Sequence, residues 1–438
     1  MIVLGDATAL QTSEDSLAMS NAPRMLEGYR VLDFTQFVAG PTCTRLMAEL
    51  GAEVVKLELA PDGDRIRDAG FKPRNDKSTS HSTYYMQHDH SKLSFAIDMK
   101  QPGARALVMS MIPKFDVLVE NFAPGVIGRM GFSYEEVKKV NPKIIMCSIS
   151  MAGQTGPLSS KAGYDTIGQA YAGVTDNLGE RDRAPIMIGM AIGDVSTGVA
   201  AAMAVFAALL HRERTGEGQY LDASLTDTYF HMHELNVPKI ALAGDRVRPK
   251  RFGSQADGPG PAGNFRYRDD QYIMILLAPH QWPQMTRAMG KPELLTDPRF
   301  QRARDRQKNR FELQAIIEEW LATFPTREDA IAAMDKERVP CAPVLSLNEA
   351  IAHPHLNERK TVRWVEDPIL GRVAIPGVPV KFSAWPDRTE LRSARLGEDN
   401  ERVLRDYLGL GDDRIRELYA NGTLVRDKGI PPSPDEVF

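Results

Sequence analysis

The feature that most constrains the fold is an alternation of short β runs with amphipathic helical stretches, which begins near residue 29. Residues 29–34 form one β run, Gly40 and Pro41 then open an amphipathic helix, and residues 53–58 form the next strand. Strand, helix and strand in this order make a βαβ unit, whose two strands are parallel and joined by a right-handed crossover. The pattern therefore starts with the building block of a parallel sheet.

The same alternation continues beyond this unit. Further strands are predicted at residues 93–97, 115–119 and 144–149, with a helix over 101–113 and a helical stretch that ends near residue 140. Repetition of this kind predicts a doubly wound α/β domain, in which ligands bind at the carboxyl ends of the strands.

A long segment rich in glycine and alanine follows at residues 194–211. It predicts a buried helix whose small side chains allow close packing, with Asp194 immediately before the helix and Ser196 and Thr197 in its first turn. Residues 221–243 are predicted to be helical as well. Charges then cluster at residues 245–251, which indicates a linker.

The middle of the chain has a different pattern. An irregular, glycine- and proline-rich loop at residues 253–263 precedes two short strands, at 264–267 and 271–276. Three helices are predicted after them, around 280–289, 310–323 and 326–335. This stretch is expected to form a smaller, separate α+β unit.

Length, charge and cysteine usage exclude several classes. A chain of 438 residues predicts two domains, and a net charge of −4 gives no global basic field for nucleic acid. The three cysteines lie far apart without CxxC spacing, which argues against disulfides and cysteine zinc sites and favours the cytoplasm. Neither a secretory signal nor a run of about 20 apolar residues is present, so no membrane association is expected.

Common catalytic motifs are absent from the sequence. It contains no GxGxxG, P-loop, HExxH or GxSxG segment, which argues against dinucleotide, nucleoside triphosphate, zinc protease and serine hydrolase chemistry. The nine histidines form no set with ligand spacing, so no metal site is predicted.

What stands out is a set of short segments that occur together in order. With them the sequence resembles the class III coenzyme A transferase family, which includes formyl-CoA transferase and carnitine CoA transferase, from about residue 26 to about residue 423. The related α-methylacyl-CoA racemases share the fold. The segments are residues 31–34 with 39–41, 50–56, 97–100, 119–125, 163–165, 192–194 and 215–219.

The resemblance implies that Asp194 is the catalytic nucleophile. Its ionised carboxylate would attack an acyl-CoA thioester to give a mixed anhydride and expel the CoA thiolate, which returns to form an aspartyl-CoA thioester. An incoming acid then reverses the sequence. The helix N-terminus beside Asp194 is expected to keep it charged and to supply N–H groups for the oxyanion. The alternative is that Asp194 is an N-cap residue.

Tyr164 and Asp165 distinguish between two activities. In the racemases a histidine stands where Tyr164 stands and acts as an acid/base group, whereas tyrosine is a poor base at neutral pH. Tyr164 therefore favours transfer, although a core tyrosine and a capping role for Asp165 stay open. An α-methylacyl-CoA racemase-like enzyme and a non-catalytic subunit of a heteromeric transferase are the alternative functions.

Coenzyme A is implied as a substrate, with no permanently bound cofactor. By resemblance, Val38 and Ala39 would line the CoA near the first βα turn, and Ile97, Asp98, Met99 and Lys100 would hold its nucleotide end. Asn121, Phe122 and Ala123 would meet the pantetheine, and Arg129 would bind a phosphate. Tyr164 and Asp165 would lie near the thioester end. Lys100 and Arg129 are alternatively solvated surface charges.

The other substrate is an acyl group or a small carboxylic acid whose identity the sequence leaves open. Val38 and Leu59 stand where formyl-CoA transferase has Gln and Arg, which puts formate and oxalate specificity in doubt. Arg65 and Arg67 are expected near the entrance of the site and would suit a dicarboxylate such as succinate. The loop at 253–263 is expected to cover the intermediate.

The family's fold implies a large Rossmann-like domain built from both ends of the chain, a small central α+β domain, and an interlaced homodimer, with a heteromer as the alternative. The predicted parts are an N-terminal arm (1–24), the first part of the large domain (25–225), a linker (226–250), the small domain (251–335), a second linker (336–360) and the C-terminal part of the large domain (361–438).

Overall fold

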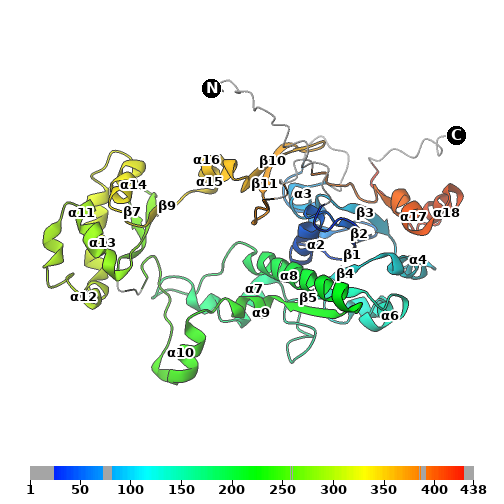
Figure 1. The fold of residues 1–438 in the computed structure, drawn as a ribbon, viewed down its shortest axis with the longest axis horizontal. Helices are drawn as coiled ribbons and strands as arrows, with labels where there is room; N and C mark the ends of the chain where they lie inside the picture. The colour runs from blue at the N-terminus through cyan, green and yellow to red at the C-terminus, as the bar shows by residue number, and fades with distance from the viewer. Residues whose placement is uncertain are drawn as a thin grey trace. The chain divides into compact units, whose positions relative to one another are not determined.

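The computed structural model describes residues 24–72, 81–256, 258, 260–383, 385 and 391–428. The chain divides into two compact units (Figure 1). The first contains residues 1–172, 189–232 and 355–438, and the second contains residues 173–188 and 233–354. All of the predicted arm except Arg24, and positions 257 and 259 of the predicted covering loop, lie outside the described residues.

A six-stranded parallel sheet forms the centre of the first unit, which confirms the predicted α/β class. Its strand order reverses between β1 and β4, so the loops after these two strands diverge to opposite faces and leave a crevice at their carboxyl ends. In spatial order the strands are β3 (Leu93–Ile97), β2 (Glu53–Leu59), β1 (Arg30–Asp33), β4 (Val117–Glu120), β5 (Ile145–Ser150) and β6 (Tyr220–Ser224).

The two faces of the sheet are buried in two separate cores. Side chains alternate along a strand, so Val31 faces one core while Leu32 faces the other. On the Val31 face lie α2 (Ala39–Glu49) and α8 (Ile192–Thr215). The Leu32 face is covered by α4 (Ala104–Met111), α6 (Tyr134–Val140), α17 (Asn400–Leu408) and α18 (Asp412–Ala420).

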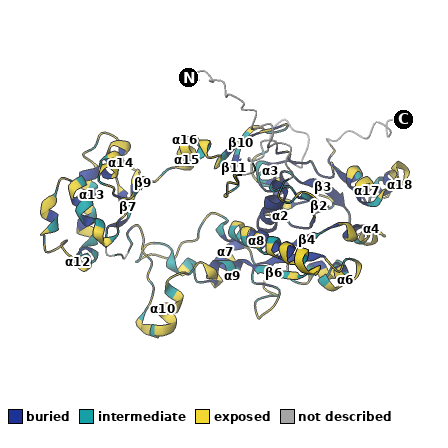
Figure 2. Ribbon diagram, in the orientation of Figure 1, coloured by how far each residue is buried: buried dark blue, intermediate teal, exposed yellow. Residues whose placement is uncertain are grey.

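Helix α8 packs closely against α2. A Cβ at Gly198 would lie 2.5 Å from the carbonyl oxygen of Ala39 and 2.7 Å from Cβ of Thr42, so only glycine allows this approach. The opposite side of α8 is exposed (Figure 2) and carries Val195, Val199, Met203 and Leu210. Among the described helices, α8 is the one long and apolar enough to cross a membrane, but its inner face is part of the core of the unit.

The C-terminal segment closes the open edge of the sheet at β3. The backbone N–H groups of Ser94, Ala96 and Asp98 donate to Asp399 Oδ2 (2.9 Å), Asn400 Oδ1 (2.8 Å) and the Thr423 carbonyl (2.8 Å), respectively. Unpaired N–H groups on an edge strand invite pairing with another chain, and this segment satisfies them.

The remaining elements of the first unit are short. A hairpin of β10 (Val362–Asp367) and β11 (Gly371–Pro376) forms a separate sheet. The helices are α3 (Thr83–Asp89), α5 (Val126–Arg129), α7 (Asp165–Tyr171) and α9 (Leu225–His231), while α16 (Pro354–Glu358) begins where the second unit's chain ends.

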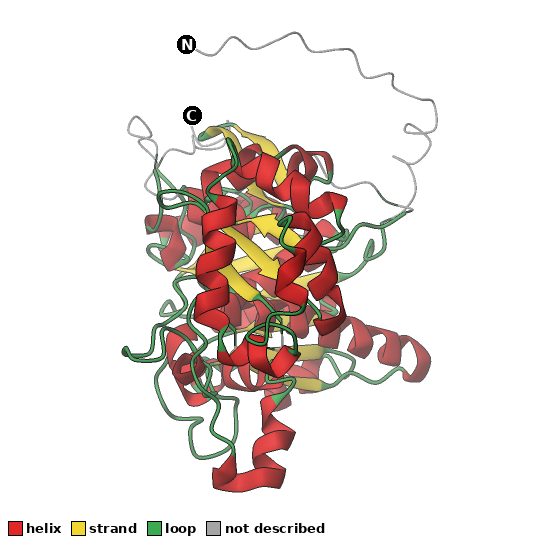
Figure 3. Cartoon of the chain, turned by 90° about the vertical axis from the view of Figure 1, so that its left-hand side faces the viewer, coloured by secondary structure: helices red, strands yellow, loops and turns green. Residues whose placement is uncertain are grey.

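The second unit is a small α+β unit with its own core. Its antiparallel sheet has the order β7 (Ala262–Arg266), β8 (Tyr272–Leu276) and β9 (Cys341–Pro343), and helices pack on it (Figure 3). Its helices are α10 (Asn236–Ala243), α11 (Trp282–Ala288), α12 (Ala303–Lys308), α13 (Arg310–Leu321), α14 (Arg327–Lys336) and α15 (Leu347–Ala352). Both residue ranges predicted as linkers therefore contain regular structure.

The clearest error of the sequence-based prediction concerns residues 221–243. They do not form one helix but the edge strand β6 followed by α9 and α10. Leu221 and Ala223 of β6 pack on the core, whereas Tyr220 is exposed on the other face. A strand of five residues with one apolar face is too short to show a clear alternation in the sequence. Its pattern therefore reads as the first turn of the helix that follows it.

Candidate functional site

A cavity of about 460 Å³ lies in the first unit at the crevice between β1 and β4. Three of its walls come from chain segments that follow β1, β4 and β5, and Asp194 and Leu225 lie at the starts of α8 and α9. Among the residues that line it are Gln36, Phe37, Val38, Ala39, Arg65, Tyr84, Asn121, Phe122, Ala123, Lys161, Tyr164 and Asp194. This is where a parallel sheet with this strand order binds ligands.

Asp194 is the third residue of α8, inside its first turn, and Ala191 is the N-cap. The interpretation of Asp194 as an N-cap residue is therefore wrong, as is its predicted place before the helix. Its half-buried side chain lines the cavity. Because it does not cap its own helix, the carboxylate can serve chemistry in the cavity.

The N–H groups of the first three residues of α8 have partners, and Val195 makes the first hydrogen bond within the helix. Ile192 N–H donates to the Met190 carbonyl (2.8 Å) and Val195 N–H to the Ala191 carbonyl (3.0 Å). Gly193 N–H donates to the Tyr229 hydroxyl (2.9 Å), and Asp194 N–H donates to Asp165 Oδ2 (2.8 Å). These groups were expected to be available to an oxyanion, and in this structure neighbouring groups occupy them.

The charge of Asp194 also differs from expectation. Burial, and secondarily the negative charge of Asp165, raise the pKa of Asp194 to about 7. The helix N-terminus was expected to keep Asp194 charged. Asp165, which accepts from the first turn, instead places a like charge beside the Asp194 carboxyl. Asp194 therefore titrates near neutrality.

Asp165 is buried behind this first turn and does not line the cavity. It is the first residue of α7, and its Oδ1 accepts from the Tyr229 hydroxyl at 2.6 Å while Oδ2 accepts from the backbone of Asp194. Tyr164, the residue before it, is 70% exposed and lines the cavity, so the alternative of a core tyrosine is wrong.

The loop after β1 is fixed by buried charges. Lys56 Nζ donates to the Thr35 carbonyl (2.8 Å) and pairs with Asp64 (2.9 Å) and Asp89 (3.1 Å). Asp64 Oδ1 in turn accepts from the backbone N–H of Phe37 at 3.1 Å. Phe37 has a φ of 65°, in the left-handed region that disfavours side chains, and such strain persists only where the surroundings hold it. The network thus presents Phe37 at the cavity.

Asn121 joins the loops after β1 and β4. Its Oδ1 accepts from Gln36 N–H and its Nδ2 donates to the Gln36 carbonyl, both at 2.7 Å. Asn121 was predicted to meet the pantetheine. It lines the cavity, but its amide is committed to the backbone of Gln36 in this structure, so it fixes the relative position of two cavity walls.

Two cationic side chains, Arg65 and Lys161, line the cavity. Arg65 lies where the sequence-based prediction expected it. Arg67 does not, because it is buried and pairs with Glu58 through Nη2 (2.6 Å) and Nε (2.7 Å). The prediction that Arg67 lies near the entrance is therefore wrong: in the 3₁₀ helix η2 (Arg65–Asp68), Ile66 and Arg67 lie on the side that faces the core.

Of the other predicted site residues, Val38, Ala39, Phe122 and Ala123 line the same cavity. Five predicted residues lie outside it. Ile97 is buried in the core at the end of β3, Asp98 accepts hydrogen bonds from Lys100 N–H (3.0 Å) and Gln101 Nε2 (3.0 Å), and Met99 packs on the core. Lys100 and Arg129 are exposed.

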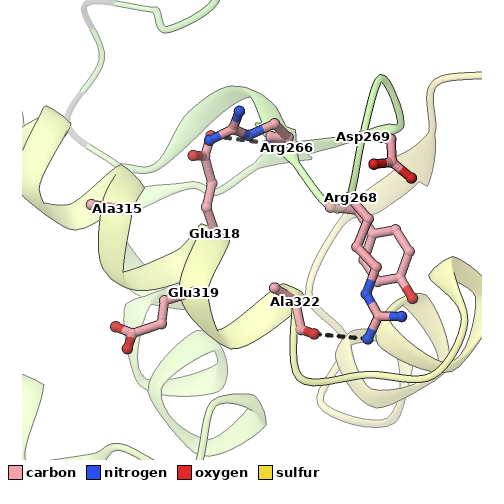
Figure 4. A pocket seen from close by; sticks show the side chains of 8 residues that line it. Arg266, Arg268, Asp269, Ala315, Glu318, Glu319 and Ala322 are labelled. Carbon is pink, nitrogen blue, oxygen red and sulfur yellow. Dashed lines mark hydrogen bonds between the residues drawn. The ribbon is translucent and has the colours of Figure 1, made fainter.

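A second depression lies on the sheet of the second unit and is lined by Arg266, Arg268, Asp269, Glu318 and Glu319 (Figure 4). Arg268 Nη2 donates to the carbonyls of Ala322 (2.9 Å) and Phe324 (2.7 Å), so its charge is already engaged. None of the predicted site residues lies there. Within the described part of the chain, no cluster of three His, Cys, Asp or Glu side chains could hold a metal.

The sequence-based prediction missed Gln36, Phe37, Tyr84, Lys161 and Tyr229. The first two could have been found, because they directly follow a predicted strand at the edge where ligands bind. Tyr229 had no such signal, since the strand before it was read as part of a helix.

Comparison with known proteins gives consistent matches. The family profile described as CoA-transferase family III matches residues 26–400. The chain is 33% identical to the succinyl-CoA–D-citramalate CoA-transferase of Chloroflexus aurantiacus, over 92% of this chain and 99% of that one. It is 32% identical to the formyl-CoA:oxalate CoA-transferase of Bradyrhizobium diazoefficiens, over 92% and 98%. The crystal structure of a CaiB/BaiF family protein from Brucella suis superposes with a TM-score of 0.78 at 30% identity, over 88% and 100%.

Proposed function

We propose that Asp194 carries the CoA as an aspartyl thioester during the reaction. The chain belongs to CoA-transferase family III and is an enzyme that acts on CoA thioesters and carboxylic acids. The observation that carries the proposal is the position of Asp194. It is a carboxyl group on the wall of the cavity at the switch point of the sheet, on a helix whose first turn is held by Asp165 and Tyr229.

The proposed reaction starts with the ionised Asp194 carboxylate. It attacks the thioester carbonyl of the donor, and the C–S bond breaks to give an acyl-aspartyl anhydride and the CoA thiolate. The thiolate attacks the aspartyl carbonyl and releases the donor acid. The acceptor carboxylate then attacks the aspartyl thioester, expels the thiolate again and forms a second anhydride. The thiolate returns to the acyl carbonyl, which gives the new acyl-CoA and restores Asp194.

Several residues are assigned supporting roles in this reaction. Val38, Ala39, Phe122 and Ala123 would line the path of the pantetheine, because they contribute to the walls of the same cavity as Asp194. The residues at the end of β3 and Arg129 would bind the distal nucleotide outside the cavity. CoA is an elongated molecule that can reach beyond the cavity. Residues inside and outside the cavity can therefore bind different parts of one CoA molecule.

We further propose that a dicarboxylic acid, such as succinate, is one of the acids. Arg65 and Lys161 place two cationic groups on the wall of the cavity that holds Asp194. A carboxylate that takes no part in the chemistry would be held by such groups. The relative from Chloroflexus aurantiacus is named for succinyl-CoA, in agreement with this choice.

The active form is proposed to be an interlaced homodimer. In support, the outer face of α8 carries an exposed apolar stripe made of Val195, Val199, Met203 and Leu210. Large exposed apolar patches are rare on monomeric soluble proteins. Contact with a second copy would bury this stripe.

The experiment is mass spectrometry of the wild-type chain and of Asp194→Ala after incubation with succinyl-CoA or, in parallel, acetyl-CoA. We expect CoA attached to the peptide that contains residue 194 in the wild type, more of it from succinyl-CoA, and none in the variant. An undiminished rate of CoA exchange in Asp194→Ala would exclude Asp194 as the carrier. Equal labelling by the two donors would exclude a preference for dicarboxylates.

A further inference from the structure

The Tyr229 hydroxyl lies between the two carboxyl residues of the site without lining the cavity. Tyr229 is 1% exposed, in α9, and its ring lies against the backbone of Gly193. A Cβ at that position would be 2.1 Å from Cε2 of the ring. Residue 193 must therefore be glycine for the ring to reach the start of α8.

The hydrogen bonds of this hydroxyl have one consistent direction. A tyrosine hydroxyl has one hydrogen and two lone pairs. It accepts from Gly193 N–H at 2.9 Å and from Gln169 Nε2 at 3.3 Å, both of which can only donate. The hydroxyl hydrogen is thus directed to Asp165 Oδ1, at 2.6 Å.

The same reasoning fixes the orientation of the Asp165 carboxylate. Its Oδ1 accepts from Tyr229 and its Oδ2 accepts from the N–H of Asp194, at 2.8 Å. With a donor on each oxygen, the carboxylate is held in one orientation. The negative charge beside Asp194 is therefore held in place by Tyr229, while the same hydroxyl holds the residue before Asp194.

We propose that Tyr229 is a positioning residue for the transfer reaction: it binds Gly193 N–H and Asp165 together, and thereby sets both the place and the protonation of Asp194. This inference rests on the proposed function of Asp194. Asp194 is also faced by Tyr84, and the cavity that it lines contains Arg65 and Lys161. None of these three hydrogen-bonds the first turn of α8, and among the described residues the side chains that accept from its N–H groups are those of Tyr229 and Asp165.

The test compares Tyr229→Phe with Tyr407→Phe. Tyr407 is also buried in the first unit and donates to a carboxylate, Glu53 Oε1, at 2.6 Å. Glu53 begins β2, at the amino end of the sheet and therefore opposite the cavity. The control variant thus loses a partly buried hydroxyl–carboxylate bond of equal length away from the site.

For Tyr229→Phe we expect kcat to fall by about tenfold to a hundredfold, the size of losing a hydrogen bond to a charged group, with KM for the acyl-CoA within about twofold. The acid limb of kcat/KM against pH should move down by about half a pH unit or more, in the same direction as for Asp165→Asn, because the hydroxyl no longer holds the Asp165 carboxylate beside Asp194. Tyr407→Phe should leave both quantities within about twofold of the wild type.

Gln169→Leu removes one of the donors to the hydroxyl and keeps its bond to Asp165, so a smaller change in the same direction is expected. This variant tests the inference even where Tyr229→Phe is poorly folded. An unchanged pH limb in both variants would overturn the role of Tyr229. If the wild type forms the aspartyl adduct and Tyr229→Phe matches Tyr407→Phe, only this inference fails; if the wild type forms no adduct, the proposed function fails instead.

Discussion

A carboxyl group that titrates near pH 7 keeps more basicity when ionised than an ordinary aspartate, which favours its use as a nucleophile. Asp194 is in this situation because it is half-buried and faces a second carboxylate. The arrangement has a disadvantage, because only part of the enzyme has Asp194 in its ionised, reactive form at neutral pH. Two acidic residues with different roles, one buried and accepting hydrogen bonds and one facing the cavity, are a common device for separating two protonation states.

The pH dependence of the reaction follows from this. The pKa of Asp194 is raised from 3.8 to about 7, so Asp194 is protonated and unreactive below that pH. We expect kcat/KM to rise with pH and to level off above a midpoint near 7, since this ratio reports the free enzyme. Asp165→Asn removes the like charge and should move the midpoint down. A midpoint near 4 in the wild type, the ordinary range of an aspartate, would contradict this.

Single residues were predictable from sequence to different degrees. Asp194, Tyr164 and the residues after β1 and β4 belong to ordered segments, and the structure gathers most of them at one cavity. The partners of the first turn of α8 were not predictable. Whether an N–H group is free depends on side chains from α7 and α9, which lie dozens of residues away and leave no local pattern.

At the scale of elements, strands with two apolar faces were located within about two residues, as expected for buried parallel strands. The edge strand β6 was missed because it has one apolar face. The contact of α8 with α2 depends on Gly198, which the sequence indicated only as one of several small residues. Since α2 begins at Ala39 on the cavity wall, the spacing of these helices also sets the width of the site.

Gly198→Ala tests this contact. The added Cβ would meet the Ala39 carbonyl at 2.5 Å, and a backbone atom cannot move away as a flexible side chain can. We expect a loss of about 1–3 kcal/mol in the free energy of unfolding, in spite of alanine's better helix propensity, together with a higher KM for acyl-CoA. Denaturant unfolding measures the first quantity. Gly189→Ala is the control, because a Cβ there meets nothing within 4 Å; equal stabilities of the two variants would refute the prediction.

At the scale of the whole molecule, the first unit is assembled from three separate stretches of the chain. The alternation in the sequence predicted the parallel sheet. That the C-terminal helices return to this sheet followed only from the resemblance to a family. The exposed stripe on α8 was not predicted, because a segment this rich in alanine and glycine reads as buried on all sides.

The stripe leads to a prediction about assembly. Met203 is 67% exposed at its centre, and an aspartate there would place a charge in an apolar interface. We expect the wild type to be a dimer and Met203→Asp to be a monomer in size-exclusion chromatography with light scattering. Val140→Asp changes an exposed apolar residue of α6 and should leave the dimer intact. A monomeric wild type, or a dimeric Met203→Asp, would refute the interface.

The edge protection of β3 has a consequence for how the protein is made. The groups that satisfy the N–H groups of Ser94, Ala96 and Asp98 come from residues 399, 400 and 423. Translation delivers them some 300 residues after the strand that they protect, at about 5–20 residues per second. Through most of its synthesis, the nascent chain therefore has an open strand edge, and one face of its sheet lacks the cover of α17 and α18. We therefore expect the ribosome-bound chain to be a client for chaperones until its final helices emerge.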